Sequence, residues 1–240
     1  MQAVVEKAGL YFVFLQKWLK RPANCAISGN RAGNMIKYIH IVKASAWNKS
    51  MYVNLIKGGC AVRNDIHIVL DSIAVAEETP LRDDPRCHVV PLLVRHGDTE
   101  WVDGEKSLQE MFAMVEASGQ LPKTSQPAIG RFLDVFTELA ADGKKVIAIM
   151  LDGVLSGTVQ TARLAARQVM SEIPGSDIRV FDSLTAACPI SGMAMEVLAY
   201  AETGATMDEL EEYLKGLIER TETYFSVNTL DYLQKGGRIG

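Results

Sequence analysis

From residue 66 onward, short strand-like runs alternate with longer segments of helical spacing, and this alternation limits the possible folds most strongly. The runs lie at 66–70, 87–94, 146–151, 178–181 and 223–227. The first and third are apolar almost throughout rather than at every second position, which predicts strands buried on both faces. Strands that alternate with helices favour a mostly parallel sheet with helices on both faces. The sequence therefore predicts an α/β fold.

The helices between these runs have recognisable start signals. Ser107 with Glu110, and Thr206 with Glu209, have the spacing of capping boxes, in which each side chain caps the other residue's backbone amide. Pro127 is placed to open the next helix, because a proline at the first helical position loses no hydrogen bond. Residues 99–104 predict a short edge strand that closes on a turn.

Charge divides the chain at residue 65. Up to that point there are ten Lys or Arg residues and two acids, although the whole chain has a net charge of −4. So sharp a shift predicts a boundary, with residues 1–65 as a basic leader that is poorly structured or foreign to the domain. Two origins stay open: a start site assigned too far upstream, or a short basic amphipathic helix around residues 10–15 that lies on a membrane surface.

Composition excludes several classes of function. The negative net charge argues against nucleic acid as a partner. Four cysteines (Cys25, Cys60, Cys87 and Cys188) form no CxxC pair and have no histidine at zinc-finger spacing, so neither a metal site nor a disulfide framework is expected. No apolar run approaches the roughly 20 residues needed to span a bilayer. We expect a cytoplasmic protein with at most transient membrane contact.

Two loops have the chemistry of an anion site. Thr124 and Ser125 lie between two prolines that stiffen the backbone, and Ser156, Gly157 and Thr158 lie between a strand end and a helix start. A helix start offers free N–H groups and a positive dipole end to an anion. The plainer interpretation is that Ser156 only caps its helix and that Thr124 is an ordinary turn residue. Parallel strands place their ligand loops at their carboxyl ends, where the loops with Asp71, Ser156 and Ser183 are expected.

The order of the motifs resembles the DegV family. Residues 122–127 read PKTSQP, 155–158 read LSGT, 182–183 read DS and 235–239 read KGGRI, while Asp71-Ser72 and residues 101–104 fit the first third of the family. The resemblance covers residues 66–240. It implies a two-domain α/β fold with a long-chain fatty acid between the domains. Residues 66–182 would form the first domain and 183–240 the incomplete start of the second, so a C-terminally truncated member is expected.

The resemblance also implies roles for single residues. Thr124 and Ser156 would hydrogen-bond the fatty-acid carboxylate. Ser125, Gly157 and Thr158 share their loops, Asp71 and Ser72 form the loop after the first strand, and Arg238 would lie near the head group or face a partner. That partner is a separate fatty acid kinase subunit, which makes an acyl phosphate from the presented acid. The chain itself would be non-catalytic and need no cofactor beyond its ligand.

This chain departs from the family pattern, and other functions stay open. Ile73 follows Asp71-Ser72 in place of a small hydroxyl residue, and Asp152-Gly153 stands where a serine pair is usual, with Asp152 expected to point to solvent. A truncated α/β module without ligand is one alternative. A lipid hydrolase with Ser156 as nucleophile is another, although G-x-S-x-G is missing and every histidine lies upstream. A phosphotransferase would need a phosphate-binding G-x-x-x-x-G-K-[ST] loop, which the sequence lacks.

Overall fold

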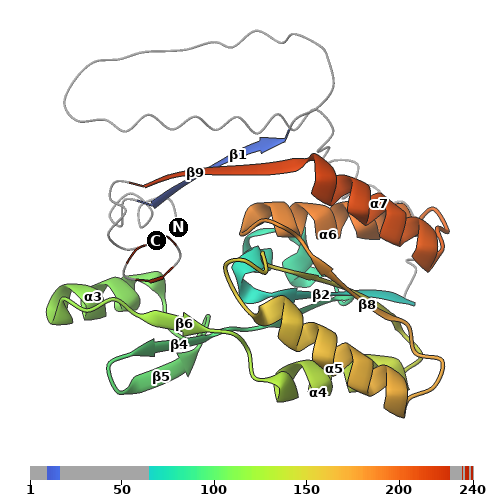
Figure 1. Cartoon of the computed structure of the whole chain (residues 1–240), viewed down its shortest axis with the longest axis horizontal. Coiled ribbons are helices and arrows are strands. Elements are labelled where there is room, and N and C mark those ends of the chain that lie inside the picture. Colours follow the sequence, from blue (N-terminus) through green and yellow to red (C-terminus); the bar gives the residue numbers. More distant parts are fainter. Residues whose placement is uncertain (1–9, 17–64, 228–233, 235, 238, 240) are drawn as a thin grey trace, which may run out of the picture.

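A four-stranded parallel sheet is the centre of the structure. The computed structural model describes residues 10–16, 65–227, 234, 236, 237 and 239. The sheet order is β3-β2-β7-β8, and each neighbouring pair is parallel. Its strands are β2 (Ile66–Asp71), β3 (Cys87–Val90), β7 (Lys145–Met150) and β8 (Ile178–Asp182). Helices cover both faces (Figure 1), which confirms the predicted α/β fold.

The continuously apolar sequences of β2 and β7 are explained by burial on both faces. Ile68 and Ile147 face a core shared with α6 (Cys188–Ala201) and α7 (Met207–Arg220). Val69 and Ala148 point the other way, toward α4 (Ile129–Ala141) and α5 (Thr158–Glu172). Because side chains alternate along a strand, one apolar run supplies both layers of the core.

A second, three-stranded antiparallel sheet flanks the first, with α3 (Leu108–Ser118) beside it. Its order is β5-β4-β6, with β4 (Leu93–His96), β5 (Thr99–Val102) and β6 (Lys123–Ser125). Three short 3₁₀ helices, at Ser72–Ala74, Ala76–Glu78 and Pro80–Asp83, connect β2 to β3. Both predicted capping boxes are present, at the starts of α3 and α7.

Three details of the predicted strands and helices were wrong. The run at 87–94 is two strands in different sheets, divided at Pro91, which has no N–H for a ladder hydrogen bond. The loop at 121–127 contains β6, which pairs with β4. Helix α4 begins at Ile129 rather than at Pro127, with Ala128 as its N-cap.

Two segments bear on the expected domains. The last predicted strand, β9 (Thr221–Val227), pairs antiparallel with β1 (Leu10–Gln16) instead of joining the parallel sheet. The alternative of an amphipathic helix around residues 10–15 is therefore wrong, because β1 occupies that stretch. The rest of the predicted leader lies outside the described residues, so its character stays a prediction. The division at residue 182 also stays a prediction, although α6 and α7 share one hydrophobic core with β2 and β7.

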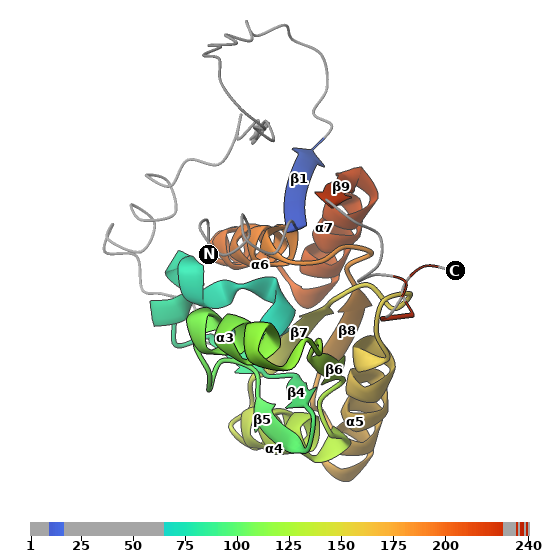
Figure 2. The same cartoon turned by 90° about the vertical axis from the view of Figure 1, so that its left-hand side faces the viewer.

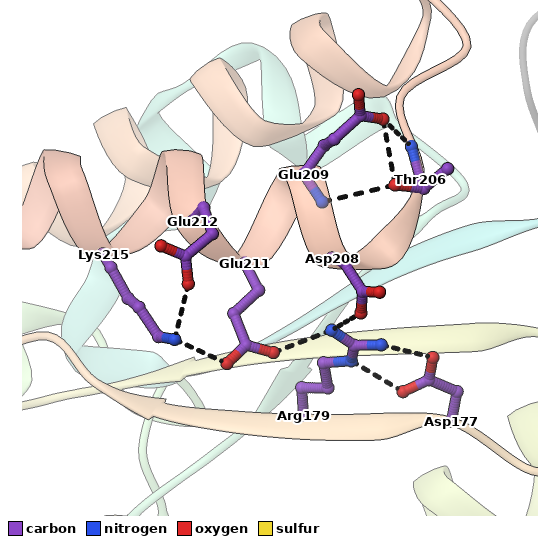
Figure 3. Close-up of polar contacts among 8 residues, drawn as sticks. All are labelled: Asp177, Arg179, Thr206, Asp208, Glu209, Glu211, Glu212 and Lys215. Atoms are coloured by element: carbon purple, nitrogen blue, oxygen red, sulfur yellow. Dashed lines mark hydrogen bonds and ion pairs between the residues drawn. The ribbon is translucent and has the colours of Figure 1, made fainter.

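Two charge clusters hold α6 and α7 in place. The Arg86 side chain is 2% exposed, and its Nε and Nη2 donate to Asp84 at 3.0 and 2.8 Å while Nη1 donates to Glu202 at the end of α6. On the outer edge of the sheet, Arg179 of β8 contacts three carboxylates, two of them on α7 (Figure 3). These contacts raise the pKa of the Arg179 guanidinium, chiefly through its hydrogen bond to Asp177.

Candidate functional site

The carboxyl edge of the parallel sheet is organised by a buried carboxylate. Asp71, the last residue of β2, has no exposed surface; its Oδ2 accepts from the Leu151 amide at 2.7 Å and its Oδ1 from the Ile73 amide at 3.1 Å. Asp71 thereby joins the loops after β2 and β7. Burial outweighs these hydrogen bonds and raises the pKa of Asp71 to about 6.

Ser72 has a similar structural task. Its hydroxyl donates to Asp103 Oδ2 at 2.6 Å and accepts from the Leu92 amide at 3.2 Å. These bonds tie the first-strand loop to the residue before β4 and to the residue after β5. Asp71 and Ser72 therefore shape the edge of the sheet, and their oxygens are occupied by the protein's own groups.

A second carboxylate, Asp182 at the end of β8, holds the next two loops together. Its Oδ1 accepts from the amides of Gly153 and Leu184, both at 3.1 Å. A Cβ added to Gly153 would lie 2.6 Å from Asp182 Oδ2, so only glycine allows this approach. The sequence predicted Asp182 as the end of a strand and as part of a family motif, but not its bonds to these two loops. The sequence did contain a signal for this contact: Gly153 and Asp182 lie at the carboxyl ends of neighbouring parallel strands.

The loop between β7 and α5 is a tight turn. Asp152 is half-buried and its carboxylate accepts from the Val154 amide at 2.9 Å, while its carbonyl accepts from the Leu155 and Ser156 amides. The carboxylate of Asp152 is thus engaged with its own loop. This turn delivers Ser156 to the start of α5.

Ser156 and Thr158 form a pair of hydroxyls at that helix start. Their oxygens lie 2.9 Å apart, and Ser156 Oγ also accepts from the Thr158 amide at 3.3 Å. Thr158 is fully buried, whereas Ser156 is half-buried. The N-cap position belongs to Gly157, which has no side chain for capping. Hydroxyls and helix amides of this kind are suited to binding an anion.

The two predicted loops meet through a glutamine. Thr124 and Ser125 are exposed residues of β6, paired with Val94 and Leu93 of β4. The next residue, Gln126, donates from Nε2 to Thr161 Oγ1 of α5 at 2.9 Å. Figure 2 shows β6 beside the start of α5.

Large apolar side chains are exposed at the same edge. Val154 is 90% exposed and Leu184 is 61% exposed. Val154 follows Gly153, whose amide donates to Asp182, and the amide of Leu184 itself donates to Asp182. A shallow depression of about 300 Å³ lies between α5, β8 and α7 and includes Asp182 and Leu184. Exposed apolar residues beside hydroxyls and helix amides suit a ligand with both a charged and an apolar part.

The described histidines lie away from this edge. His67 and His88 are bonded to each other at 2.8 Å between ring nitrogens, and His96 contacts Ser118 and the Gln120 carbonyl. Arg238 lies outside the described residues. Among those described, no group of three or more His, Cys, Asp or Glu is arranged to hold a metal ion, and no helix is long and apolar enough to cross a membrane.

A family model and the curated relatives of this chain point to the same protein family. A family model described as "Uncharacterised protein, DegV family" matches residues 65–240. The DegV domain-containing protein YejH of Lactococcus lactis is 33% identical over 174 residues, covering 72% of this chain and 60% of that protein. A Streptococcus pneumoniae DegV domain-containing protein is 34% identical over 176 residues, covering 73% and 61%. The chain thus spans about three fifths of these relatives' length.

Similar solved structures come from the same family as these relatives. A DegV family protein from Thermus thermophilus, whose structure was solved in a study of fatty acid binding, is 32% identical to this chain, with a TM-score of 0.64. The match covers 73% of this chain and 61% of that one. A DegV family protein from Ruminococcus gnavus, refined with vaccenic acid, is 27% identical with a TM-score of 0.66 and coverages of 72% and 61%.

Proposed function

The chain belongs to the DegV family, and from this premise we propose that it binds a long-chain fatty acid by its carboxylate where β6 meets the start of α5. The observation that carries the proposal is the junction itself. Thr124 and Ser156, 32 positions apart in the sequence, belong to loops that Gln126 joins by its bond to Thr161. The fatty acids described for the Thermus and Ruminococcus relatives support the ligand class.

The head group would be held by hydroxyls and helix amides. Side chains alternate along an extended strand, so Thr124 and Gln126 project to one side of β6 and Ser125 to the other. Since Gln126 reaches α5, Thr124 projects toward the helix start where Ser156 and Thr158 lie. Hydrogen bonds to an ionised carboxylate are stronger than neutral ones, and the helix dipole favours the negative charge.

Affinity for the acyl chain would come from burial. Val154 and Leu184 are the apolar side chains that we propose contact it, because both are exposed beside the head-group loops. Each buried CH₂ contributes about 0.8 kcal/mol. Replacing Val154 and Leu184 together by aspartate should weaken binding of stearic acid while leaving the thermal midpoint nearly unchanged, since both side chains face solvent.

We further propose that the protein is non-catalytic and presents the bound acid to a fatty acid kinase subunit. Ser156 shares its hydroxyl with Thr158, and the described histidines are engaged elsewhere, so the arrangement supplies no general base for a hydrolase. Arg238 is the proposed head-group or kinase-facing residue. If Arg238→Ala lowers acyl phosphate formation by an added kinase subunit but leaves stearate affinity unchanged, Arg238 faces the partner; a loss of affinity places it at the head group.

The deciding experiment is mass spectrometry of the purified chain, followed by stearate titration of variants. A released fatty acid near one per chain is expected from the wild type. Thr124→Ala and Ser156→Ala should each weaken stearate binding by about tenfold to a hundredfold, the loss of one hydrogen bond to a charged group, and the double variant should be weaker still. Ser125→Ala, on the other side of β6, should have a smaller effect. Unchanged affinity in the double variant would refute the head-group assignment.

A further inference from the structure

We infer that Gln126 is a positioning residue: it clamps β6 onto the first turn of α5 and thereby sets the spacing between Thr124 and Ser156. This inference rests on the proposed function, because the spacing matters only if both hydroxyls bind one carboxylate. We call the contacts of Gln126 with Gly157 and Thr161 the Gln126 clamp.

The need for a clamp follows from the architecture. Thr124 belongs to the three-stranded sheet through the pairing of β6 with β4, whereas Ser156 precedes a helix that packs on the parallel sheet. The two hydroxyls therefore sit on separate units of the fold. β6 is only three residues long, and the pairing of β6 with β4 gives it no fixed distance to α5.

The clamp is a short chain of hydrogen bonds that returns to the helix start. Gln126 Nε2 donates to Thr161 Oγ1 at 2.9 Å, and Thr161 Oγ1 donates onward to the Gly157 carbonyl at 3.3 Å. Thr161 is 7% exposed, so its hydroxyl is held in a fixed place. A bond to a fixed partner restrains the otherwise exposed Gln126 side chain, and with it the adjoining end of β6.

Gly157 is the matching half of the clamp. A Cβ at this position would lie 2.0 Å from Gln126 Oε1 and 3.1 Å from its Cδ, so the amide of Gln126 lies directly against the glycine backbone. The backbone at Gly157 has φ −75° and ψ 6°, which an alanine adopts readily. A methyl group here would therefore disturb the close approach of Gln126 rather than the conformation of the backbone.

A thermodynamic cycle in urea tests the clamp itself. Gly157→Ala should lower the urea midpoint in the wild-type background, because the new methyl group displaces Gln126. In the Gln126→Ala background the same change should cost less, because the overlapping atoms are gone and only the poorer capping by alanine remains. Gly130→Ala, in α4 with nothing within 4 Å of its Cβ position, is the control and should act equally in both backgrounds. An equal loss from Gly157→Ala in both backgrounds would overturn the clamp.

Binding of carboxyl-¹³C-labelled stearate tests the positioning role. Gln126→Ala should weaken binding by about threefold to tenfold and shift the carboxyl resonance of the bound acid. Thr161→Val should reproduce both effects, since it breaks the clamp from the helix side, and the double variant should be no worse than either single one. Gln160→Ala, an exposed glutamine in the same helical turn, should change neither quantity.

The outcomes separate the two proposals. If Gln126→Ala weakens binding but Thr161→Val does not, Gln126 contacts the ligand directly and the positioning role is overturned. The role is equally refuted if affinity and resonance stay unchanged in both variants while the wild type binds. A wild type that binds no stearate would overturn the proposed function and the positioning role together, and the urea cycle would still decide whether the clamp exists.

Discussion

Replacing Asp71 by asparagine is expected to remove a pH dependence from the stability of the fold. The Asp71 carboxylate is fully buried at the end of β2, where it accepts from the amides of Leu151 and Ile73. Asparagine can accept only one of these bonds and turns its own NH₂ toward the other amide. Asp71→Asn should therefore be less stable than the wild type near neutral pH. Because asparagine does not ionise, the stability of the variant should lack the pH dependence that Asp71 causes.

The sign and size follow from the two pKa values. Burial raises the pKa of Asp71 from 3.8 to about 6, so between these values the folded protein holds a proton that the unfolded chain has lost. The contribution of Asp71 to stability is therefore greatest below pH 3.8, falls as the pH rises toward 6, and is constant above that. The full difference is about 3 kcal/mol, of which about 1 kcal/mol lies between pH 5 and pH 8.

Urea unfolding at pH 5 and pH 8 measures this effect. The difference in unfolding free energy between wild type and Asp71→Asn should shrink by about 1 kcal/mol at pH 8, because the wild type loses stability there and the variant does not. Asp98→Asn, at an exposed turn, is the matched control for removing a carboxylate. A difference between wild type and Asp71→Asn that is the same at both pH values would refute the reasoning.

Two further predictions concern the frame around the site. Arg86→Met removes the guanidinium that pairs with the carboxylates of Asp84 and Glu202 in a buried place and should cost about 3–5 kcal/mol in urea unfolding; a loss below about 1 kcal/mol would show that the ion pairs contribute little. Gly153→Ala places a methyl group 2.6 Å from Asp182 Oδ2 and should lower both the thermal midpoint and stearate affinity, whereas an unchanged midpoint would show that the loop after β7 adapts freely.

Much of the fold could be predicted because its signals are local. The apolar runs of β2, β7 and β8 and both capping boxes depend on neighbours within a few positions, and the structure contains all of them. The pairing of strands depends on distant residues. Nothing near residues 123–125 shows that β6 pairs with β4, and nothing near 221–227 shows that β9 leaves the parallel sheet.

The candidate site was predicted in the same uneven way. The hydroxyls of Thr124 and Ser156 were identified from stiff loops and a helix start, but not what brings these loops together. Gln126 hydrogen-bonds to Thr161, 35 positions away, and Arg86 to Glu202, 116 positions away. A polar side chain in a sequence gives no sign of whether its partner is solvent or a distant residue.

The sequence by itself determined the α/β class, the helix starts and the hydroxyl-bearing loops, because hydrophobic periodicity and capping operate over a few residues. Only the tertiary structure decided which oxygens remain available to a ligand. Asp71, Ser72 and Asp182 are occupied by backbone amides or neighbouring side chains, whereas Thr124 is exposed. The physical reason is that a polar atom buried by folding must bond to whatever the fold brings to it, and that partner is set by packing across the whole domain.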